Sequence, residues 1–225
     1  MEALSDLEIR ILGTLIEKSM ATPEYYPLTL KGLRAGCNQA TNRAPVTDYE
    51  ELDIEEGVKS LKLKGLLYYV EPKGGHEVRK YEHTLFEEHR WGLSKGQIAL
   101  FSMLLLRGEQ TASELRTRVR EKMIDLSPAQ TDEMLESGAA MEDSVFFRVP
   151  RQPGQREPRW RHRISLAERE NPSSASILPD ADAPPSPPPF QGYAPASEWV
   201  SRDEYLALLD RVRRLEDQIL KLLGH

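Results

Sequence analysis

The chain has 225 residues, a net charge of -6, 39% hydrophobic residues and a single cysteine, Cys37. One cysteine excludes an internal disulfide framework, and no apolar run reaches the roughly 18 residues that a membrane-spanning helix needs. Acidic Glu2, Asp6 and Glu8 stand where a secretory signal would carry cations. We therefore expect a soluble, cytoplasmic protein without a membrane partner.

The first part of the chain contains a pattern that is repeated further on. A shift of 89 positions superposes Ser5 on Ser94, and each serine precedes apolar residues at the same spacing. Shorter amphipathic segments follow from Thr29 and from Thr111. Repetition at this scale predicts two similar small domains. The predicted domains are residues 1–90 and residues 91–166.

The first copy predicts three helices followed by a β-hairpin. The second helix ends near Gly36, and Asp53 is the expected N-cap of the third, which Gly65 ends. The expected helices are 5–18, 28–36 and 53–64, and the expected strands are 66–70 and 78–85 around a turn at 72–77. This order is that of a winged helix-turn-helix domain.

The second copy predicts the same order. Its helices are expected at 94–107, at 111–122 and from Ser127–Pro128 onward, with Ser127 as N-cap. A hairpin follows over 144–164, with its turn at Pro153–Gly154. Alternation along the last strand places Trp160, His162 and Ile164 on one face and Arg159, Arg161 and Arg163 on the other.

The C-terminal part changes in character. Residues 167–196 include the run PPSPPP and predict a flexible proline-rich linker. Residues 197–225 predict an amphipathic coiled-coil helix whose heptad seam favours a parallel homodimer. An alternative is that this helix folds back on its own domains. The seam consists of Tyr205, Leu208, Val212, Leu215, Ile219 and Leu222. The expected fold class is therefore mainly α with small β-hairpins (α+β), with two tandem winged helix-turn-helix domains plus this helix.

Five segments over residues 1–166 resemble the YceH-like family of uncharacterised bacterial proteins. The segments are LEIRILGTLIEK, TPEYYPLTLKGL, CNQATNRAPV, LLLRGEQTASELRTR and REPRW. The resemblance implies a pair of winged-helix domains, often followed by a C-terminal coiled coil, and implies no established activity. The proline-rich stretch 171–189 departs from the family's pattern.

Residues suited to catalysis do not form a pattern. The histidines His76, His83, His89, His162 and His225 are dispersed, without a second cysteine or an HExxH motif to complete a zinc site. Lone Cys37 is better explained as a small buried apolar group than as a nucleophile. We therefore expect no enzymatic activity, no metal and no cofactor.

Charge is distributed unevenly along the chain. The net charge is -4 over residues 1–90, +2 over 91–166 and -4 over 167–225. The third helix of each copy, which would enter the major groove of DNA, begins with acidic residues. These residues are Asp53, Glu55 and Glu56 in the first copy and Asp132, Glu133 and Glu136 in the second. Such helix starts would be repelled by phosphates.

Cations gather instead on the predicted wings. Arginines dominate residues 148–163, where Glu157 is the lone acid. We expect any contact with double-stranded DNA to involve the wings, nearby lysines and the polar loop after the second helix. The candidates are Arg151, Arg156, Arg159, Arg161, Arg163, Lys73, Arg79, Lys80, Asn38, Asn42, Arg43, Lys59 and Lys62. Alternatively, the arginines protect an edge strand from association, and the loop side chains stabilise their own turn.

Two functions follow from these patterns. The first is a non-enzymatic, DNA-binding, transcriptional-regulator-like protein that uses its wings and basic loops. The alternative is a protein–protein interaction scaffold of winged-helix domains without sequence-specific DNA binding, which the acidic third helices favour. A continuous positive strip on the folded surface would favour DNA, whereas interruption by acids would favour a protein partner.

Overall fold

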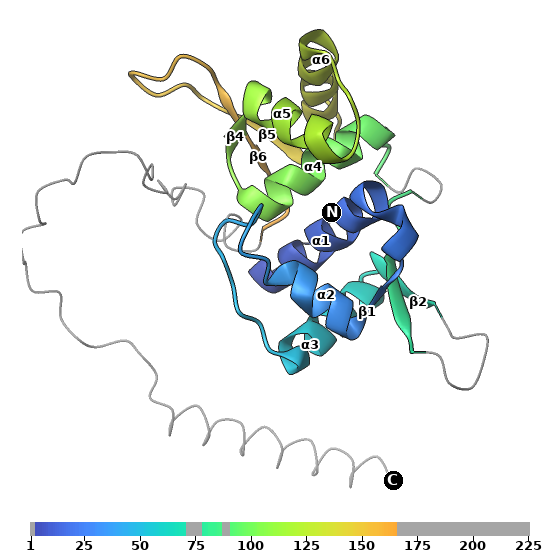
Figure 1. The fold of residues 1–225 in the computed structure, drawn as a ribbon. Coiled ribbons are helices and arrows are strands. Elements are labelled where there is room, and N and C mark those ends of the chain that lie inside the picture. The colour runs from blue at the N-terminus through green and yellow to red at the C-terminus, as the bar shows by residue number, and fades with distance from the viewer. Residues whose placement is uncertain (1–2, 71–77, 87–90, 166–225) are drawn as a thin grey trace, which may run out of the picture. The chain divides into compact units, whose positions relative to one another are not determined.

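The computed structural model describes residues 3–70, 78–86 and 91–165. Within these ranges the chain forms six α-helices and six short strands, in an order that occurs twice apart from one 3-10 helix (Figure 1). The first set is α1 (Asp6–Ala21), η1 (Pro23–Tyr25), β1 (Leu28–Thr29), α2 (Leu30–Cys37), α3 (Glu51–Leu63), β2 (Leu67–Val70) and β3 (Lys80–His83). The second is α4 (Lys95–Arg107), β4 (Gln110–Thr111), α5 (Ala112–Lys122), α6 (Pro128–Ala139), β5 (Phe146–Val149) and β6 (Arg159–His162). The predicted mixed α+β class is confirmed.

Five helices are capped by a hydroxyl side chain, and four of them, α1, α4, α5 and α6, begin where the sequence predicts. The side chains of Ser5, Ser94, Thr111 and Ser127 each accept the backbone N–H three residues further on. These bonds satisfy N–H groups that have no partner inside the helix. Pro128 fits the first position of α6 because that position needs no N–H. The predicted starts of these helices are confirmed to within a residue.

Two other predicted helix starts are wrong. The helix expected from about Leu28 begins at Leu30, because Leu28 and Thr29 pair with strand β3 instead. The helix expected to be capped by Asp53 begins at Glu51. The carboxylate of Asp53 accepts the backbone N–H of Glu50 at 2.7 Å, so Asp53 lies inside the first turn.

Each set of strands forms a three-stranded antiparallel sheet, with the orders β1-β3-β2 and β4-β6-β5. The registers correspond, since Leu67 pairs with His83 and Phe146 pairs with His162. The predicted alternation along the last strand is confirmed, because Trp160, His162 and Ile164 are buried. Each sheet therefore turns one face of its central strand toward the helices.

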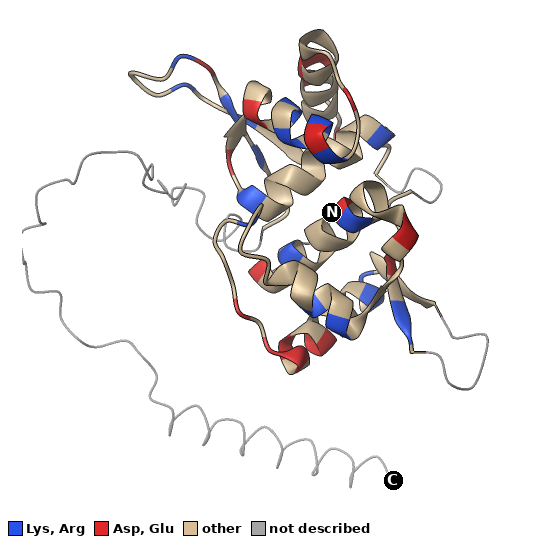
Figure 2. Cartoon of the chain, in the orientation of Figure 1, with Lys and Arg blue, Asp and Glu red and all other residues tan. Residues whose placement is uncertain are grey.

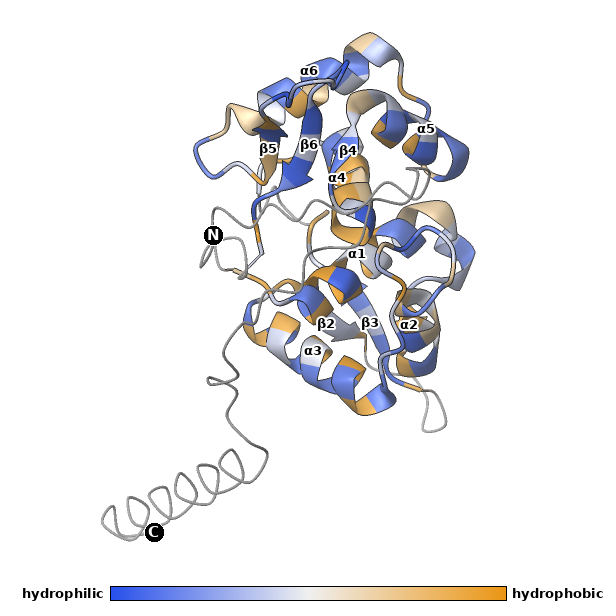
Figure 3. Cartoon of the chain, turned by 90° about the vertical axis from the view of Figure 1, so that its left-hand side faces the viewer, coloured by the Kyte–Doolittle hydropathy of each residue, from blue (hydrophilic) through white to orange (hydrophobic). Residues whose placement is uncertain are grey.

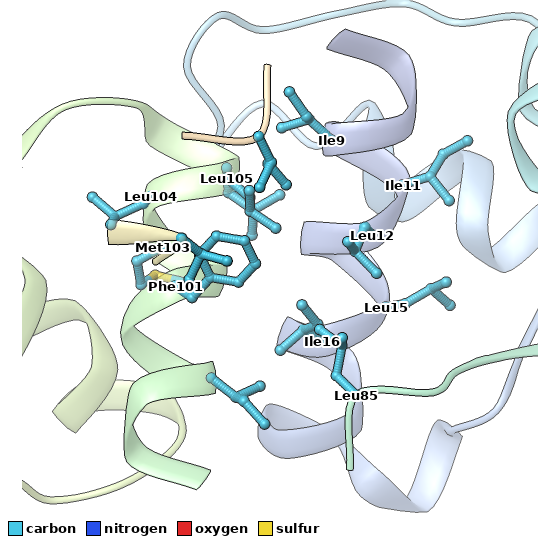
Figure 4. Packing of buried hydrophobic residues seen from close by; sticks show 14 of the residues in the cluster. Ile9, Ile11, Leu12, Leu15, Ile16, Leu85, Phe101, Met103, Leu104 and Leu105 are labelled. Atoms are coloured by element: carbon cyan, nitrogen blue, oxygen red, sulfur yellow. The ribbon is translucent and has the colours of Figure 1, made fainter. Parts of the chain in front are cut away.

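Helices α1 and α4 pack against each other, and buried residues of both sets form one continuous hydrophobic cluster. Figure 4 shows Ile9 and Ile16 pointing from α1 toward Phe101 and Leu105 of α4, while Ile11 points away from α4. Hydrophobic segments lie along both helices where they face each other (Figure 3). The two copies of the repeated pattern thus pack through equivalent helices.

Gly13 lets the two helices approach closely. A Cβ atom at this position would lie 2.9 Å from Cβ of Leu105 and 3.0 Å from the side chain of Leu106. The backbone of the loop after α2 also crosses to the second set, since the N–H of Ala44 donates to the carbonyl of Leu106 at 2.9 Å. Side-chain volume at Gly13 is therefore tightly limited.

No helix among the described residues has the length and apolarity to cross a membrane. The predicted linker 167–196 and the predicted C-terminal helix 197–225, with its dimerisation seam, lie outside the described residues. Lys73 and the turn at 72–77 also lie outside them. The predicted independence of domains 1–90 and 91–166 stays a prediction.

Candidate nucleic-acid interface

The hairpin between β5 and β6 carries three of the predicted arginines in exposed positions. Its turn lies at Pro153–Gly154, as predicted, and Gly154 adopts a φ of 93°, which favours glycine. Arg151 and Arg156 flank this turn on the surface. Arg151 donates to the carbonyl of Gln155 at 3.1 Å, and Arg156 makes no hydrogen bond or ion pair with other described residues. Both guanidinium groups can therefore reach a phosphate.

Two arginines of the same strands are neutralised by neighbouring acids. Nε of Arg159 lies 3.2 Å from the carboxylate of Glu109, and Nη2 lies 3.4 Å from that of Glu114. Arg148 pairs with Glu136 of α6 at 2.9 Å. Arg159 therefore ties β6 to the segment around β4 and to the start of α5, which favours a structural role over a DNA contact.

Arg161 and Arg163 project from the last strand beside an aromatic ring. Their guanidinium carbons lie 4.8 and 5.4 Å from the ring centroid of Phe147, within the range of a cation–π interaction. Arg163 is exposed, whereas Arg161 is half-buried. Arg163 thus lies at the base of the hairpin, where its backbone N–H donates to the carbonyl of Val145 at 3.0 Å, whereas Arg151 and Arg156 flank the turn.

A groove of about 590 Å³ lies between α5, α6 and the hairpin. Its floor includes Trp160, which is 3% exposed, and its walls carry charges of both signs. Arg116 of α5 faces this groove and was missed by the sequence analysis. The signal in the sequence is the presence of four cations in α5. The lining charges are Arg116, Arg148, Asp132, Glu136 and Glu157.

In the first half, cations surround one tyrosine of β2. Nζ of Lys62 lies 3.8 Å from the ring centroid of Tyr69, and the guanidinium carbon of Arg79 lies 4.9 Å from it. Lys80 is exposed on β3. Lys59 pairs with Glu55 along α3 at 3.7 Å. The structure therefore brings Lys62 and Arg79 together over Tyr69, while Lys59 is paired with Glu55.

Arg43 of the predicted loop contact is buried inside the fold. This side chain is 4% exposed, and Nη2 lies 2.6 Å from the carboxylate of Glu17. Asn38 is used internally, because its amide donates to the carbonyl of Tyr49 and its oxygen accepts the N–H of Tyr49, both at 2.9 Å. Asn42 is half-buried with a φ of 60°. The alternative reading, in which loop side chains stabilise their own backbone, is confirmed for Asn38.

Acidic residues separate the cations that remain. Figure 2 shows both signs interspersed over the described chain, with acids gathered at the start of α3. The exposed arginines of the β5–β6 hairpin belong to the second half, and the cations around Tyr69 belong to the first. Because Arg43 is buried and Asn38 is bonded to Tyr49, the loop does not join these groups. Among the described residues, the cations are therefore divided between the two halves and interrupted by acids.

Groups that could carry chemistry are held inside the fold. Cys37 is fully buried, its thiol donates to Thr14 at 3.6 Å, and burial raises its pKa to about 11. Its reading as a buried apolar group is confirmed. Across the described ranges, no three His, Cys, Asp or Glu residues gather as ligands for a metal ion.

The described chain is thus a protein of two repeated α+β units with a cationic hairpin on the second. Residues 4–155 match the model of a family described as "Protein of unknown function, DUF480", and the chain belongs to this family. A UPF0502 protein of Geobacter metallireducens is 37% identical over 216 residues, covering 96% of this chain and 88% of the relative. UPF0502 proteins of Shewanella loihica and Dechloromonas aromatica are 38% and 44% identical, covering 97% and 72% of this chain and 94% and 74% of the relatives.

Proposed function

We propose that this protein is a non-enzymatic DNA-binding protein of the transcriptional-regulator kind, built from two winged helix-turn-helix domains. The repeated order of three helices and a hairpin supports this proposal, as does the short strand that joins each hairpin as a third strand. The hairpins take the place of wings. The relatives' names give no activity, so the proposal rests on the surface residues of this structure.

The exposed cations of the β5–β6 hairpin are the observation that supports DNA contact. Arg151, Arg156 and Arg163 are exposed there, and Glu157 is the acid within the hairpin. Exposed Asp132 and Glu133 of α6 would repel phosphates if this helix entered the major groove. We infer a contact that is led by the hairpin and directed to the phosphate backbone, with little readout of base sequence.

A salt titration tests this function. Binding of the full chain to a random-sequence duplex is followed by fluorescence anisotropy between low and moderate salt. Replacing Arg151 and Arg156 with alanine should weaken binding and reduce the salt slope by about 2, because each phosphate contact contributes about 1. The matched control replaces exposed Lys31 and Lys95, which lie on other helices. An unchanged slope in the hairpin variant would rule out hairpin-led binding.

The second candidate function is a protein–protein interaction scaffold without sequence-specific DNA binding. The interruption of the cations by acids favours this function, as do the acidic starts of α3 and α6. The proposed homodimer through the C-terminal seam would suit either function. Light scattering on the chain ended at Ala196 tests that seam, since a dimer that persists would remove it from this role.

A further inference from the structure

Helix α3 exposes two leucines that have no counterpart on α6. Leu52 is 73% exposed and Leu63 is 90% exposed. Single exposed leucines are common on protein surfaces, but these two share one face of one helix. They are separated by three helical turns, so their side chains leave the axis in nearly the same direction, about 16 Å apart.

Two opposite charges lie between the leucines on the same face. Glu56 and Lys59 are both exposed, and the helical repeat places them with Leu52 and Leu63 within about 60° of arc. The order along this face is therefore leucine, acid, base, leucine. When a second copy of this helix lies antiparallel to the first, each leucine faces a leucine and each charged residue faces one of opposite charge. The face is consequently self-complementary.

We propose that a second copy of the chain docks on this face, with the two α3 helices antiparallel around a two-fold axis between Gly57 and Val58. Leu52 then meets the partner's Leu63, and Glu56 meets the partner's Lys59. Each of these contacts occurs twice, as a two-fold interface requires.

Charge excludes the parallel arrangement and disfavours other occupants. In a parallel pair, Glu56 would face the partner's Glu56 and Lys59 would face the partner's Lys59, and like charges repel. The N-terminal half of α3 carries Glu51, Glu55 and Glu56, which would also repel a nucleic acid. Helix α6 has no lysine or arginine, so it lacks the complementary half of the pattern. The proposed contact is therefore specific to the first half of the chain.

The proposed interface is small. One pair of helices buries less than the roughly 1,200 Å² of a standard stable interface, so we expect a dimer of micromolar affinity or weaker. The contact leaves the β5–β6 hairpin of each copy uncovered, because that hairpin belongs to the second half. It does not rest on DNA binding, although a dimer would present two hairpins and raise overall affinity for a duplex.

Cysteine cross-linking of the full chain tests the register. Leu52→Cys/Leu63→Cys places thiols that face each other between copies, while the two thiols within one helix lie about 16 Å apart, too far for a disulfide. Native Cys37 is fully buried and should not react. Under mild oxidation, the double variant should form a dimer at least about tenfold faster than either single variant, with position 52 linked to position 63 by peptide mapping.

The single variants are the matched controls. They retain any association through the C-terminal segment but lack the facing partner thiol. Equal rates for the single and double variants, or links joining 52 to 52, would overturn the proposal. Loss of DNA binding in the Arg151 and Arg156 variants would leave this result unaffected, so the two proposals fail separately.

A second test exchanges the charges at Glu56 and Lys59 in the Leu52→Cys/Leu63→Cys variant. Glu56→Lys or Lys59→Glu alone places like charges together twice per dimer and should slow cross-linking roughly fivefold at low salt. Combining both changes restores opposite pairs and should restore the rate. Glu133→Lys on exposed α6 is the control for net charge. A combined variant that is as slow as the single variants would also overturn the proposal.

Discussion

Nη2 of Arg43 lies 2.6 Å from Oε2 of Glu17, and both side chains are almost completely buried. Nε of Arg43 also donates to the carbonyl of Gly36 at 3.0 Å. Burial alone would raise the pKa of Glu17, but the hydrogen bond and positive charge of Arg43 outweigh it and hold that pKa below its usual range. This pair fastens the loop after α2 to α1.

Replacing Arg43 with methionine should therefore destabilise the fold strongly. The change keeps much of the side-chain volume but leaves the Glu17 carboxylate buried without its partner, which costs about 3–5 kcal/mol. Urea unfolding followed by circular dichroism measures the loss. Lys31→Met, at an exposed site, is the control and should change stability by less than about 0.5 kcal/mol. A loss below about 1 kcal/mol in Arg43→Met would contradict this account.

His83 and His162 occupy equivalent places in the two sheets and should make stability depend on pH. Both are buried, and burial lowers the pKa of each to about 4. Nε2 of His83 lies 3.0 Å from the hydroxyl of Ser19, whereas Nδ1 of His162 has no hydrogen-bond partner among the described residues. Both rings are therefore held neutral inside the fold.

The unfolded chain binds these protons near pH 6.5, so between pH 6.5 and 4 it holds more protons than the folded chain. Stability is consequently greatest above pH 6.5 and falls as the pH is lowered toward 4. Each histidine should lower the free energy of unfolding by about 2 kcal/mol when the pH falls from 7 to 5. Urea unfolding at both pH values measures this loss. In His162→Gln the loss should be half of that in the unsubstituted chain. The Glu17 contribution is lost only at lower pH, because its folded pKa is depressed.

Local signals in the sequence predicted most of the helices and strands. Ser94 and Ser127 could be recognised as caps because a hydroxyl side chain bonds the backbone within one turn. Alternation at Trp160 and His162 predicted the buried face of the last strand for a similar reason, since adjacent side chains point to opposite faces. The start of α3 was missed because Glu50 and Asp53 both suit a helix start, and only the fold selects between them.

The candidate site could be predicted only in part, because its charges pair across long sequence separations. Arg156 and Arg159 look alike in the sequence, yet Arg159 contacts Glu109 and Glu114 while Arg156 remains exposed. Arg43 lies in a polar loop that resembles a surface segment, but it is buried against Glu17 of helix α1, which is distant in the sequence. Hydrophobic spacing is a property of neighbouring residues, whereas ion pairing depends on the tertiary fold.

The close approach of α1 and α4 at Gly13 predicts an unusual response to alanine. In an exposed helix, Gly→Ala stabilises by about 1 kcal/mol. At Gly13 the new Cβ would lie 2.9 Å from Cβ of Leu105, so we expect a loss of about 1–3 kcal/mol in thermal or urea unfolding. Gly32→Ala in α2 is the control, because its closest contact, at 3.3 Å, would be the hydroxyl of Thr29 and not a packed neighbouring helix. Equal stabilisation by both changes would show that the helices can separate without cost.

Alanine substitutions at Arg159 and Arg156 should distinguish an arginine that stabilises the β5–β6 hairpin from one that contacts DNA. Arg159→Ala removes contacts with Glu109 and Glu114 at a partly exposed site, so it should lower the free energy of unfolding by about 1 kcal/mol. Its effect on the salt slope of duplex binding should be negligible, since its charge is already neutralised. Arg156→Ala should do the reverse, reducing the slope by about 1 while changing stability by less than about 0.5 kcal/mol. If the two variants reduce the slope equally, Arg159 leaves its acids to contact DNA, and the structural role assigned to it is wrong.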